Sequence, residues 1–414
     1  MERDAYEIAL EDYDLSGPSL YQEERWQSYF ARLREEAPVH YCRESPHGPY
    51  WSVTTHDLIK AVDTNHRDFS SALGVSIQDE KALPTPGDID VQNFISMDPP
   101  RHDEQRRSVA PATAPSNLAN LEPVIRNRVV EILESLPAGE TFNWVDRVSI
   151  ELTASMLAVL FDFPHEDRRQ LVHWSDVATR AQQITADDGM LDQHNANMEE
   201  LQQCGLRFYE LWFERASQPP KSDLISMLAH GEATRNMHED PGLFLGNILL
   251  LIIGGNDTTR NSISGGVVAL NEYPDEYRKL REDHSLVSKM VPEMIRWQTP
   301  VVHMRRQATR DIELGGQQIS EGDKVLMWYL SGNRDEKVFK DADRFIVDRP
   351  NARNHLSFGF GIHRCMGNRL AELQLRVLWE EILKRFENIE VVGEVERMPS
   401  NFIRGIASVP VRLS

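Results

Sequence analysis

Cysteine is scarce in this chain of 414 residues, which has three of them: Cys42, Cys204 and Cys365. Three cysteines so far apart cannot build a disulfide framework, and the sequence has no Cys-x-x-Cys pair, which excludes a zinc knuckle and a thioredoxin-like redox motif. An odd and sparse set of cysteines is typical of proteins in a reducing cytoplasm. We therefore expect no disulfide bonds and a cytoplasmic location.

Basic residues are also few relative to acidic ones. The chain has 45 Lys and Arg against 65 Asp and Glu, which gives a net charge of −20. Most of such a surface repels a polyanion, so we expect no nucleic-acid partner. Charged residues make up 27% and hydrophobic residues 40% of the chain, which is ordinary for a globular protein and excludes a disordered or collagen-like one.

Long hydrophobic runs are missing as well. The most apolar stretch, 243–253, is 11 residues long and contains Gly246 and Asn247, whereas a membrane span needs about 20 residues. Residues 1–7 are acidic, whereas a signal peptide begins with basic residues and an apolar run. These patterns predict a soluble intracellular protein without a membrane anchor.

The patterns along the chain predict one integrated domain over residues 1–414, mainly α with a smaller β part. No internal repeat, long Gly/Ser linker or charge block divides the sequence. Helical spacing dominates 98–300 and 368–386, and β-like patterns occur at about 40–60, 301–330 and 388–414. Residues 241–273 predict one helix ended by Pro274, about 48 Å long at 1.5 Å per residue, which must cross the middle of the molecule.

Chemistry is concentrated around Cys365, in the segment F-G-F-G-I-H-R-C-M-G from Phe358 to Gly367. Most lone cysteines are small core residues, and a dinucleotide-binding fingerprint would need Gly where Arg364 stands. Here the dipole and free N–H groups of the following helix favour a thiolate. The glycines of the loop would let it approach a flat ligand closely: Gly359, Gly361 and Gly367. A single thiolate with no second protein ligand nearby suggests the fifth ligand of a haem.

The predicted long helix carries a second unusual segment. Gly254 and Gly255 cost about 1 kcal/mol each in a helix interior, and room for a ligand is the usual reason for such a cost. Leu250, Gly254, Asp257 and Thr258 share one face, which is apolar, then empty, then carries an acid and an alcohol. The alternative is a kinked core helix with a solvated Asp257.

Two further pairs are weak signals by themselves. Glu293 and Arg296, at i and i+3, usually form a surface ion pair. His102 and Arg106, at i and i+4, lie on a helix that Asp98-Pro99-Pro100 is expected to open, with Asp98 as N-cap acceptor and prolines in the first turn.

Together these four segments resemble the cytochrome P450 family. The loop fits its F-G-x-G-x-H-x-C-x-G pattern at every fixed position, and Glu293 and Arg296 fit its E-x-x-R helix. Residues 254–258 resemble its central-helix motif, and residues 98–106 resemble its D-P-P-x-H-x-x-x-R segment. The order and spacing match from residue 98 to 386, so the resemblance implies the cytochrome P450 fold, with the long central helix over a buried haem.

The resemblance also implies residue roles. Cys365 would be the axial thiolate of haem b, with Phe358 and Gly359 beside the cofactor. The haem propionates would be held by His102, Arg106, Arg306 and His363, with Arg305 as the alternative to Arg306. Glu293 and Arg296 would pair with a third arginine, Arg344 or Arg349, in a structural role. Asp257 and Thr258 would be the acid–alcohol pair that delivers protons during O2 activation.

Extended strings around these motifs look most like the bacterial alkane hydroxylase branch, which oxidises the terminal methyl of medium-chain alkanes and fatty acids. Thr258 argues for an O2-dependent monooxygenase. The expected substrate pocket is apolar and comprises Leu250, Ile253, Gly254, Val301, Val302, Met304, Phe402 and Ile403. A terpenoid or sterol-like substrate is one alternative. A non-catalytic haem sensor is another, which the Asp257–Thr258 pair argues against.

Electrons should come from NAD(P)H through separate partners, a ferredoxin and a ferredoxin reductase, because the chain is too short to include a fused reductase. An acidic enzyme that meets an acidic ferredoxin needs a local basic patch on the Cys365 side, for which the candidates are Arg106, Arg107, Arg364 and Arg369. Residues 79–90 and 186–189 stand where access loops of the family lie.

Overall fold

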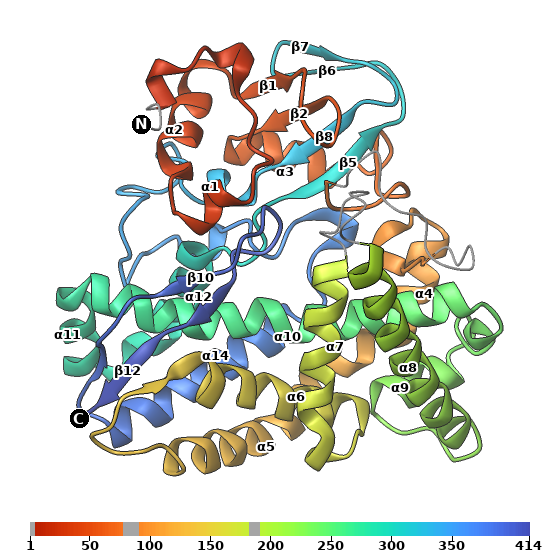
Figure 1. Ribbon diagram of the computed structural model, residues 1–414, viewed down its shortest axis with the longest axis vertical. Coiled ribbons are helices and arrows are strands. Elements are labelled where there is room, and N and C mark those ends of the chain that lie inside the picture. The colour runs from red at the N-terminus through yellow and green to blue at the C-terminus, as the bar shows by residue number, and fades with distance from the viewer. Residues whose placement is uncertain (1–4, 78–90, 182–190) are drawn as a thin grey trace.

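Helices dominate the computed structural model, and a small sheet lies at one end of them (Figure 1). The structure describes residues 5–77, 91–181 and 191–414. The expected mainly α architecture with a smaller β part is confirmed. The access loops predicted at 79–90 and 186–189 lie outside the described residues.

The described helices of four residues or more that bear on the site fall into two groups. Those N-terminal to the central helix are α1 (Ser19–Gln22), α2 (Trp26–Glu36), α3 (His56–Thr64), α4 (Arg101–Val109), α5 (Pro115–Glu134), α6 (Glu151–Phe161), α7 (Arg168–Ala181), α8 (Leu191–Ala216) and α9 (Leu224–His230). The central helix and those after it are α10 (Pro241–Glu272), α11 (Pro274–Glu282), α12 (Val287–Gln298), α13 (Tyr329–Gly332) and α14 (Asn368–Arg385).

The strands follow the alternating segments of the sequence. They are β1 (Val39–Cys42), β2 (Tyr50–Val53), β3 (Phe69–Ser70), β4 (Phe142–Asn143), β5 (Met304–Ala308), β6 (Ile312–Leu314), β7 (Gln317–Ile319), β8 (Lys324–Met327), β9 (Ile389–Val391), β10 (Glu396–Arg397), β11 (Ile406–Ser408) and β12 (Pro410–Leu413). The largest sheet has the order β1-β2-β8-β5-β3, in which β2 and β8 are parallel. It joins the N-terminal segment to the strands that follow the E-x-x-R helix.

The predicted long helix is α10, and it crosses the middle of the molecule (Figure 1). The Asp240 carboxylate caps its first turn by accepting from the Leu243 N–H at 3.1 Å, and Pro274 begins the next helix. By length and composition α10 could cross a membrane, yet 67% of its most apolar window is buried inside the protein. It is therefore a core helix, packed against α6, α7 and α12.

The start of α4 differs from the expectation. Asp98 is not its N-cap, because the Asp98 carboxylate accepts hydrogen bonds from the Ser70 hydroxyl and from the Ser71 N–H at 3.1 Å. Helix α4 begins at Arg101 after Pro100. Asp98 thus ties the start of α4 to the end of β3, which fixes His102 and Arg106 relative to the sheet.

His303 joins three segments of the chain through buried hydrogen bonds. It is fully buried; its Nε2 accepts from the Ile77 N–H at 3.1 Å, so Nδ1 carries the proton and donates to the Asn401 carbonyl at 2.9 Å. Burial lowers the pKa of His303 to about 4. The neutral ring therefore holds together the chain at Ile77, the chain before β5 and the C-terminal loop.

This histidine predicts a loss of stability in mild acid. The unfolded chain binds the proton near pH 6.5 and the folded chain near pH 4, so the stabilisation is complete above pH 6.5 and is lost as the pH falls toward 4. The shift corresponds to about 3 kcal/mol. Urea unfolding at pH 7 and pH 4 should show that His303→Gln, which keeps a donor and an acceptor, loses about 3 kcal/mol less than the native chain. Equal losses in both proteins would contradict this assignment.

Candidate functional site

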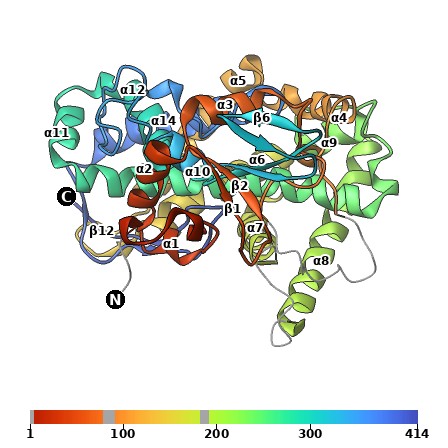
Figure 2. The same ribbon diagram turned by 90° about the horizontal axis from the view of Figure 1, so that it is seen from above.

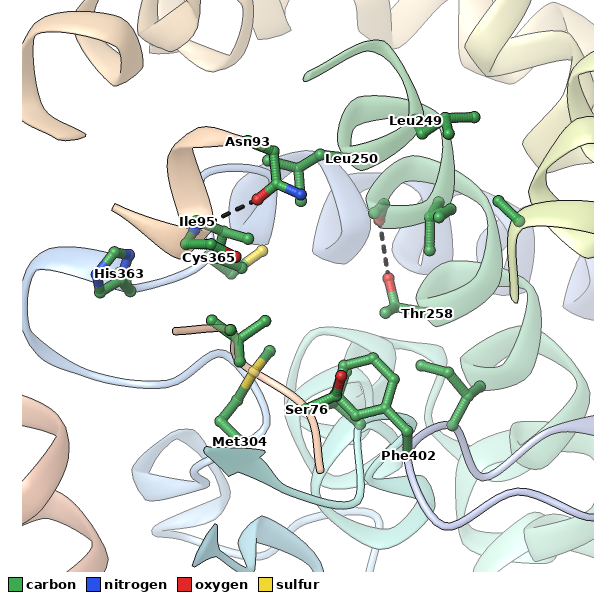
Figure 3. A pocket seen from close by; sticks show the side chains of 18 of the residues that line it. Ser76, Asn93, Ile95, Leu249, Leu250, Thr258, Met304, His363, Cys365 and Phe402 are labelled. Atoms are coloured by element: carbon green, nitrogen blue, oxygen red, sulfur yellow. Dashed lines mark hydrogen bonds between the residues drawn. The ribbon is translucent and has the colours of Figure 1, made fainter. Parts of the chain in front are cut away.

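A cavity of about 1500 Å³ lies between α10, the Cys365 loop, β5 and the segment 399–403 (Figure 3). Pockets for small ligands are usually about 300–1,000 Å³, so this cavity has room for a large ligand and a second molecule beside it. Most predicted site residues line it: Arg106, Leu250, Ile253, Gly254, Thr258, Val301, Met304, Arg306, Phe358, Gly359, His363, Cys365, Phe402 and Ile403.

Cys365 faces this cavity just before α14. Its N–H donates to the Phe358 carbonyl at 2.7 Å, which closes the loop. Burial raises the pKa of the Cys365 thiol, whereas the N–H groups of Gly367 and Asn368 and the charges of Arg106 and Arg364 lower it. The features expected to favour a thiolate are present, but in the free thiol the effect of burial on the pKa is larger than theirs. Coordination to a cation would remove the proton outright.

Two of the three glycines of the loop, Gly359 and Gly361, lie against α3. Gly361 has φ +65°, and a Cβ there would lie 2.4 Å from the carbonyl oxygen of Asp63 at the end of α3. Gly359 also has a positive φ, and its Cβ would lie 3.2 Å from the Asp63 carboxylate. Both glycines let the loop adopt a left-handed backbone and approach α3. Contact with α3 accounts for glycine at both positions, and Gly359 also lines the cavity.

Asp63 organises this side of the site, and the sequence patterns did not reveal it. Its carboxylate is buried and accepts from Arg306 Nη2 at 2.8 Å, from the Tyr329 hydroxyl at 2.8 Å and from the Phe360 N–H at 2.7 Å. These partners come from β5, α13 and the Cys365 loop. No local pattern marks Asp63, since it is one acid in a nine-residue helix.

Two histidines meet beside the cysteine. The rings of His102 and His363 are 4.3 Å apart between centroids. Among the described residues, His102 Nε2 and both ring nitrogens of His363 are buried without a hydrogen-bond partner. Burial, with nearby Arg306, lowers the pKa of His363 to about 2. Arg106 lines the same cavity and donates to the Arg364 carbonyl.

Arg306 and Arg305 point to opposite faces of β5, as strand geometry requires. Arg306 lines the cavity together with Met304, and Arg305 does not. Arg106, Arg306 and the unpartnered ring of His363 therefore line a cavity that also holds a thiol, and His102, which does not line it, packs against His363. This donor set fits haem, whose carboxylates accept from Arg and His and whose iron takes one thiolate.

Thr258 lies across the cavity from Cys365 (Figure 3). Its hydroxyl donates to the Gly254 carbonyl at 3.0 Å. A Cβ added at Gly254 would meet no atom within 4 Å, whereas at Gly255 it would lie 2.7 Å from Leu157 Cδ2. Gly254 thus leaves room in the cavity, as the sequence suggested. Gly255 is required instead by the close packing of α6 on α10.

Asp257 does not share the cavity face, contrary to the expectation, and it is not solvated either. It is 1% exposed and points to α7. Its Oδ1 accepts from Arg260 at 3.0 Å and from Asn256 at 2.8 Å, and its Oδ2 accepts from Thr179 at 3.1 Å. Burial raises the pKa of Asp257, and the charge of Arg260 lowers it.

The ion pair of Arg260 continues toward the surface. Arg260 also donates to Asp176 Oδ1 at 3.0 Å, and the Asp176 side chain is 37% exposed. Asp257, Arg260 and Asp176 therefore form a charged chain that links the backbone beside Thr258 to solvent.

Glu293 and Arg296 form a buried network, not surface decoration. Both are fully buried, and Arg296 donates to Glu293 through Nε at 2.7 Å and Nη2 at 2.8 Å. Of the two candidate partners, Arg349 is the one whose side chain reaches Glu293, at 2.9 Å to both oxygens. Arg344 contributes its carbonyl, which accepts from Arg296 and Arg349. The network fixes the segment that leads to the Cys365 loop.

One predicted pocket residue lies elsewhere. Val302 does not line the cavity, because strand-like alternation turns it away from Val301. It packs in the apolar cluster that contains Trp328 and Leu330.

Comparisons with known proteins agree with this site. The family model for cytochrome P450 matches residues 16–412. The chain is 37% identical to linalool 8-monooxygenase of Pseudomonas putida (98% of this chain, 99% of that protein) and 32% identical to a methyl-branched lipid omega-hydroxylase of Mycobacterium bovis (93% and 90%). The solved structure of CYP153D17 from Sphingomonas sp. PAMC 26605 is 47% identical, with a TM-score of 0.91 over 98% of this chain and 100% of that one. With the cysteine loop, the long helix and the buried Glu–Arg–Arg network all in place, the chain belongs to the cytochrome P450 family.

Proposed function

We propose that this cytochrome P450 monooxygenase hydroxylates the terminal carbon of medium-chain alkanes or fatty acids. The observation that carries the proposal is the placement of Thr258 and Cys365 on opposite sides of a cavity with an apolar wall (Figure 3). The wall comprises Leu249, Leu250, Ile253, Val301, Met304 and Phe402. An apolar chain would bind there by burial of its surface.

Each functional residue then has a role toward haem b. Cys365 would supply the thiolate ligand of its iron, and His102, Arg106, Arg306 and His363 would hold its propionates. Haem with a thiolate ligand, when bound, supplies the activation of O2 and the cleavage of its O–O bond. Thr258, which lines the cavity, would pass a proton into it, and Asp257, the preceding residue on the α7 side of α10, would be the carboxyl from which that proton comes. Asp63 keeps Arg306 and the cysteine loop in one position.

Support for a terminal position comes from the relative whose name is methyl-branched lipid omega-hydroxylase. A second candidate, a terpenoid substrate, is favoured by the relative named linalool 8-monooxygenase, which is 37% identical. Both candidates need the same apolar wall.

Product regiochemistry tests the proposal. Octane, dodecanoic acid and linalool are incubated with the haem-loaded enzyme and surrogate redox partners, and the products are identified by mass spectrometry. We expect 1-octanol and 12-hydroxydodecanoic acid. Predominantly in-chain alcohols would overturn the terminal assignment, and turnover of linalool alone would favour the terpenoid candidate.

We also propose a ferredoxin as electron donor, itself reduced from NAD(P)H by a reductase, in the cytoplasm. Arg107, Arg364 and Arg369 are exposed, and Arg106 ties α4 to the cysteine loop through the Arg364 carbonyl. These cations lie on the cysteine side of an otherwise acidic protein. They would attract the acidic ferredoxin where the path to Cys365 is short.

Charge reversal at Arg364 should slow reduction by ferredoxin. In stopped-flow measurements at low salt we expect Arg364→Glu to lower the second-order rate constant about tenfold and to weaken its salt dependence. Lys289 is an exposed residue in the first turn of α12, a helix that lies far from α4 in Figure 1, so Lys289→Glu makes the same change in net charge and should have little effect. Equal rates for Arg364→Glu and the native enzyme would contradict docking at this patch.

A further inference from the structure

His194 is an unusual residue in the cavity wall. The part of the wall built by α7, α8 and α9 comprises Ala178, Ala181, Met198, Leu201 and Leu224, and His194 on α8 is the one polar side chain among them. His194 is 8% exposed. Within the described residues, neither of its ring nitrogens has a hydrogen-bond partner.

An unpartnered buried imidazole has a physical cost. More than nine in ten buried polar groups in proteins are hydrogen-bonded, and leaving one unpaired costs free energy comparable with a lost hydrogen bond. Because His194 lines the cavity, its ring is the polar group that a molecule inside the cavity meets at this wall. A neutral imidazole offers one donor and one acceptor, which a hydroxyl or carboxyl group complements.

We propose that His194 binds the oxygen-bearing end of the substrate chain and thereby selects oxygenated chains over bare hydrocarbons. Helix α8 leads away from α10, with its N-terminal end farthest from it (Figure 2). His194, in the first turn of α8, is therefore remote from the middle of α10, where Thr258 and Gly254 lie. A chain whose oxygen is held at α8 would extend its opposite, apolar end toward Thr258.

The inference deepens the proposed function and rests on it only for which end of the chain is oxidised. Met198 and Leu201 follow His194 on the same face of α8 and are buried and apolar. They would contact the carbon chain next to its oxygen group. The substrate class is then a chain with one hydroxyl or carboxyl end, such as a fatty acid or a fatty alcohol.

Binding to the haem-loaded enzyme tests the inference with matched pairs of ligands. Dissociation constants are measured from the substrate-induced spectral shift for 1-dodecanol, dodecanoic acid and dodecane, and for linalool against its hydrocarbon counterpart myrcene. We expect His194→Phe to weaken binding of the oxygenated ligands about tenfold and to leave the hydrocarbons within about twofold. His194→Gln, which keeps a donor and an acceptor, should restore most of the preference.

Two control variants distinguish a polar anchor at His194 from a packing effect and from a cationic anchor. Met198→Leu changes packing on the same helix face and should alter both members of a pair equally. Arg101, an exposed cation at the cavity, is tested as a carboxylate anchor through Arg101→Gln. The inference is overturned if His194→Phe weakens hydrocarbons and oxygenated ligands alike, as it would if water satisfied the ring, or if Arg101→Gln alone removes the preference for the acid.

The outcome is distinguishable from a failure of the proposed function. If linalool but not the dodecyl compounds binds, terminal chain hydroxylation is wrong, yet the ratio of linalool to myrcene still reports on His194. If terminal products form and that ratio does not depend on His194, the proposed function stands and the anchor does not.

Discussion

Cys365→Ala should abolish the thiolate-type Soret band in the carbon monoxide difference spectrum of the reduced, haem-loaded protein. It should also reduce product formation to background. The reason is that, within the described residues, Cys365 is the one cysteine that lines the cavity. The remaining cysteines, Cys42 and Cys204, are buried and do not line the cavity.

The control for this prediction is Cys204→Ala. Cys204 lies on α8 and is fully buried, which raises the pKa of its thiol. Its replacement should therefore cost some stability and leave the spectrum intact. Cys365 faces the cavity, so Cys365→Ala should leave the urea midpoint of the haem-free chain nearly unchanged. A persistent thiolate-type band in Cys365→Ala would overturn the ligand assignment and, with it, the roles given to the surrounding loop.

The parts of the site that were predicted from the sequence are marked by patterns of consecutive residues. The cysteine loop is read from ten consecutive residues, and the long helix is read from an uninterrupted pattern ended by Pro274. Asp63 had no such signal, because its role depends on contacts with residues up to 297 positions away along the chain. Which of Arg344 and Arg349 meets Glu293 was likewise open until the fold brought Arg349 to 2.9 Å.

Two errors have a simple geometric origin. Consecutive residues of a helix point about 100° apart, so when Thr258 faces the cavity, Asp257 is turned toward α7. Consecutive residues of an extended chain point to opposite sides, so Val301 and Val302 cannot both line the cavity. Lying next to a functional residue in the sequence is therefore weaker evidence for a place in the same site than lying on the same face of the helix or strand.

We expect the second large effect from substitution of Asp257, whose side chain is turned away from the cavity. Asp257→Asn should lower the rate of product formation about 100-fold, the usual scale for loss of a proton-transfer group. The dissociation constant of the substrate should change less than twofold, because Asp257 does not line the cavity. Burial raises the pKa of Asp257, which favours a carboxyl that can carry a proton.

Asp176→Asn separates proton transfer from structural support. It removes the other carboxylate partner of Arg260 and leaves Asp257 in place. If Asp257 supplies protons, Asp176→Asn should have the smaller effect on rate, and Asp257→Asn alone should raise the solvent kinetic isotope effect. Equal losses in Asp257→Asn and Asp176→Asn, with no change in the isotope effect, would show that the ion pairs support the packing of α7 on α10 and that protons enter elsewhere.

Thr258→Ala should keep electron consumption but lower the amount of product formed per NADH. The reason is that no hydroxyl at this position then directs the proton within the cavity.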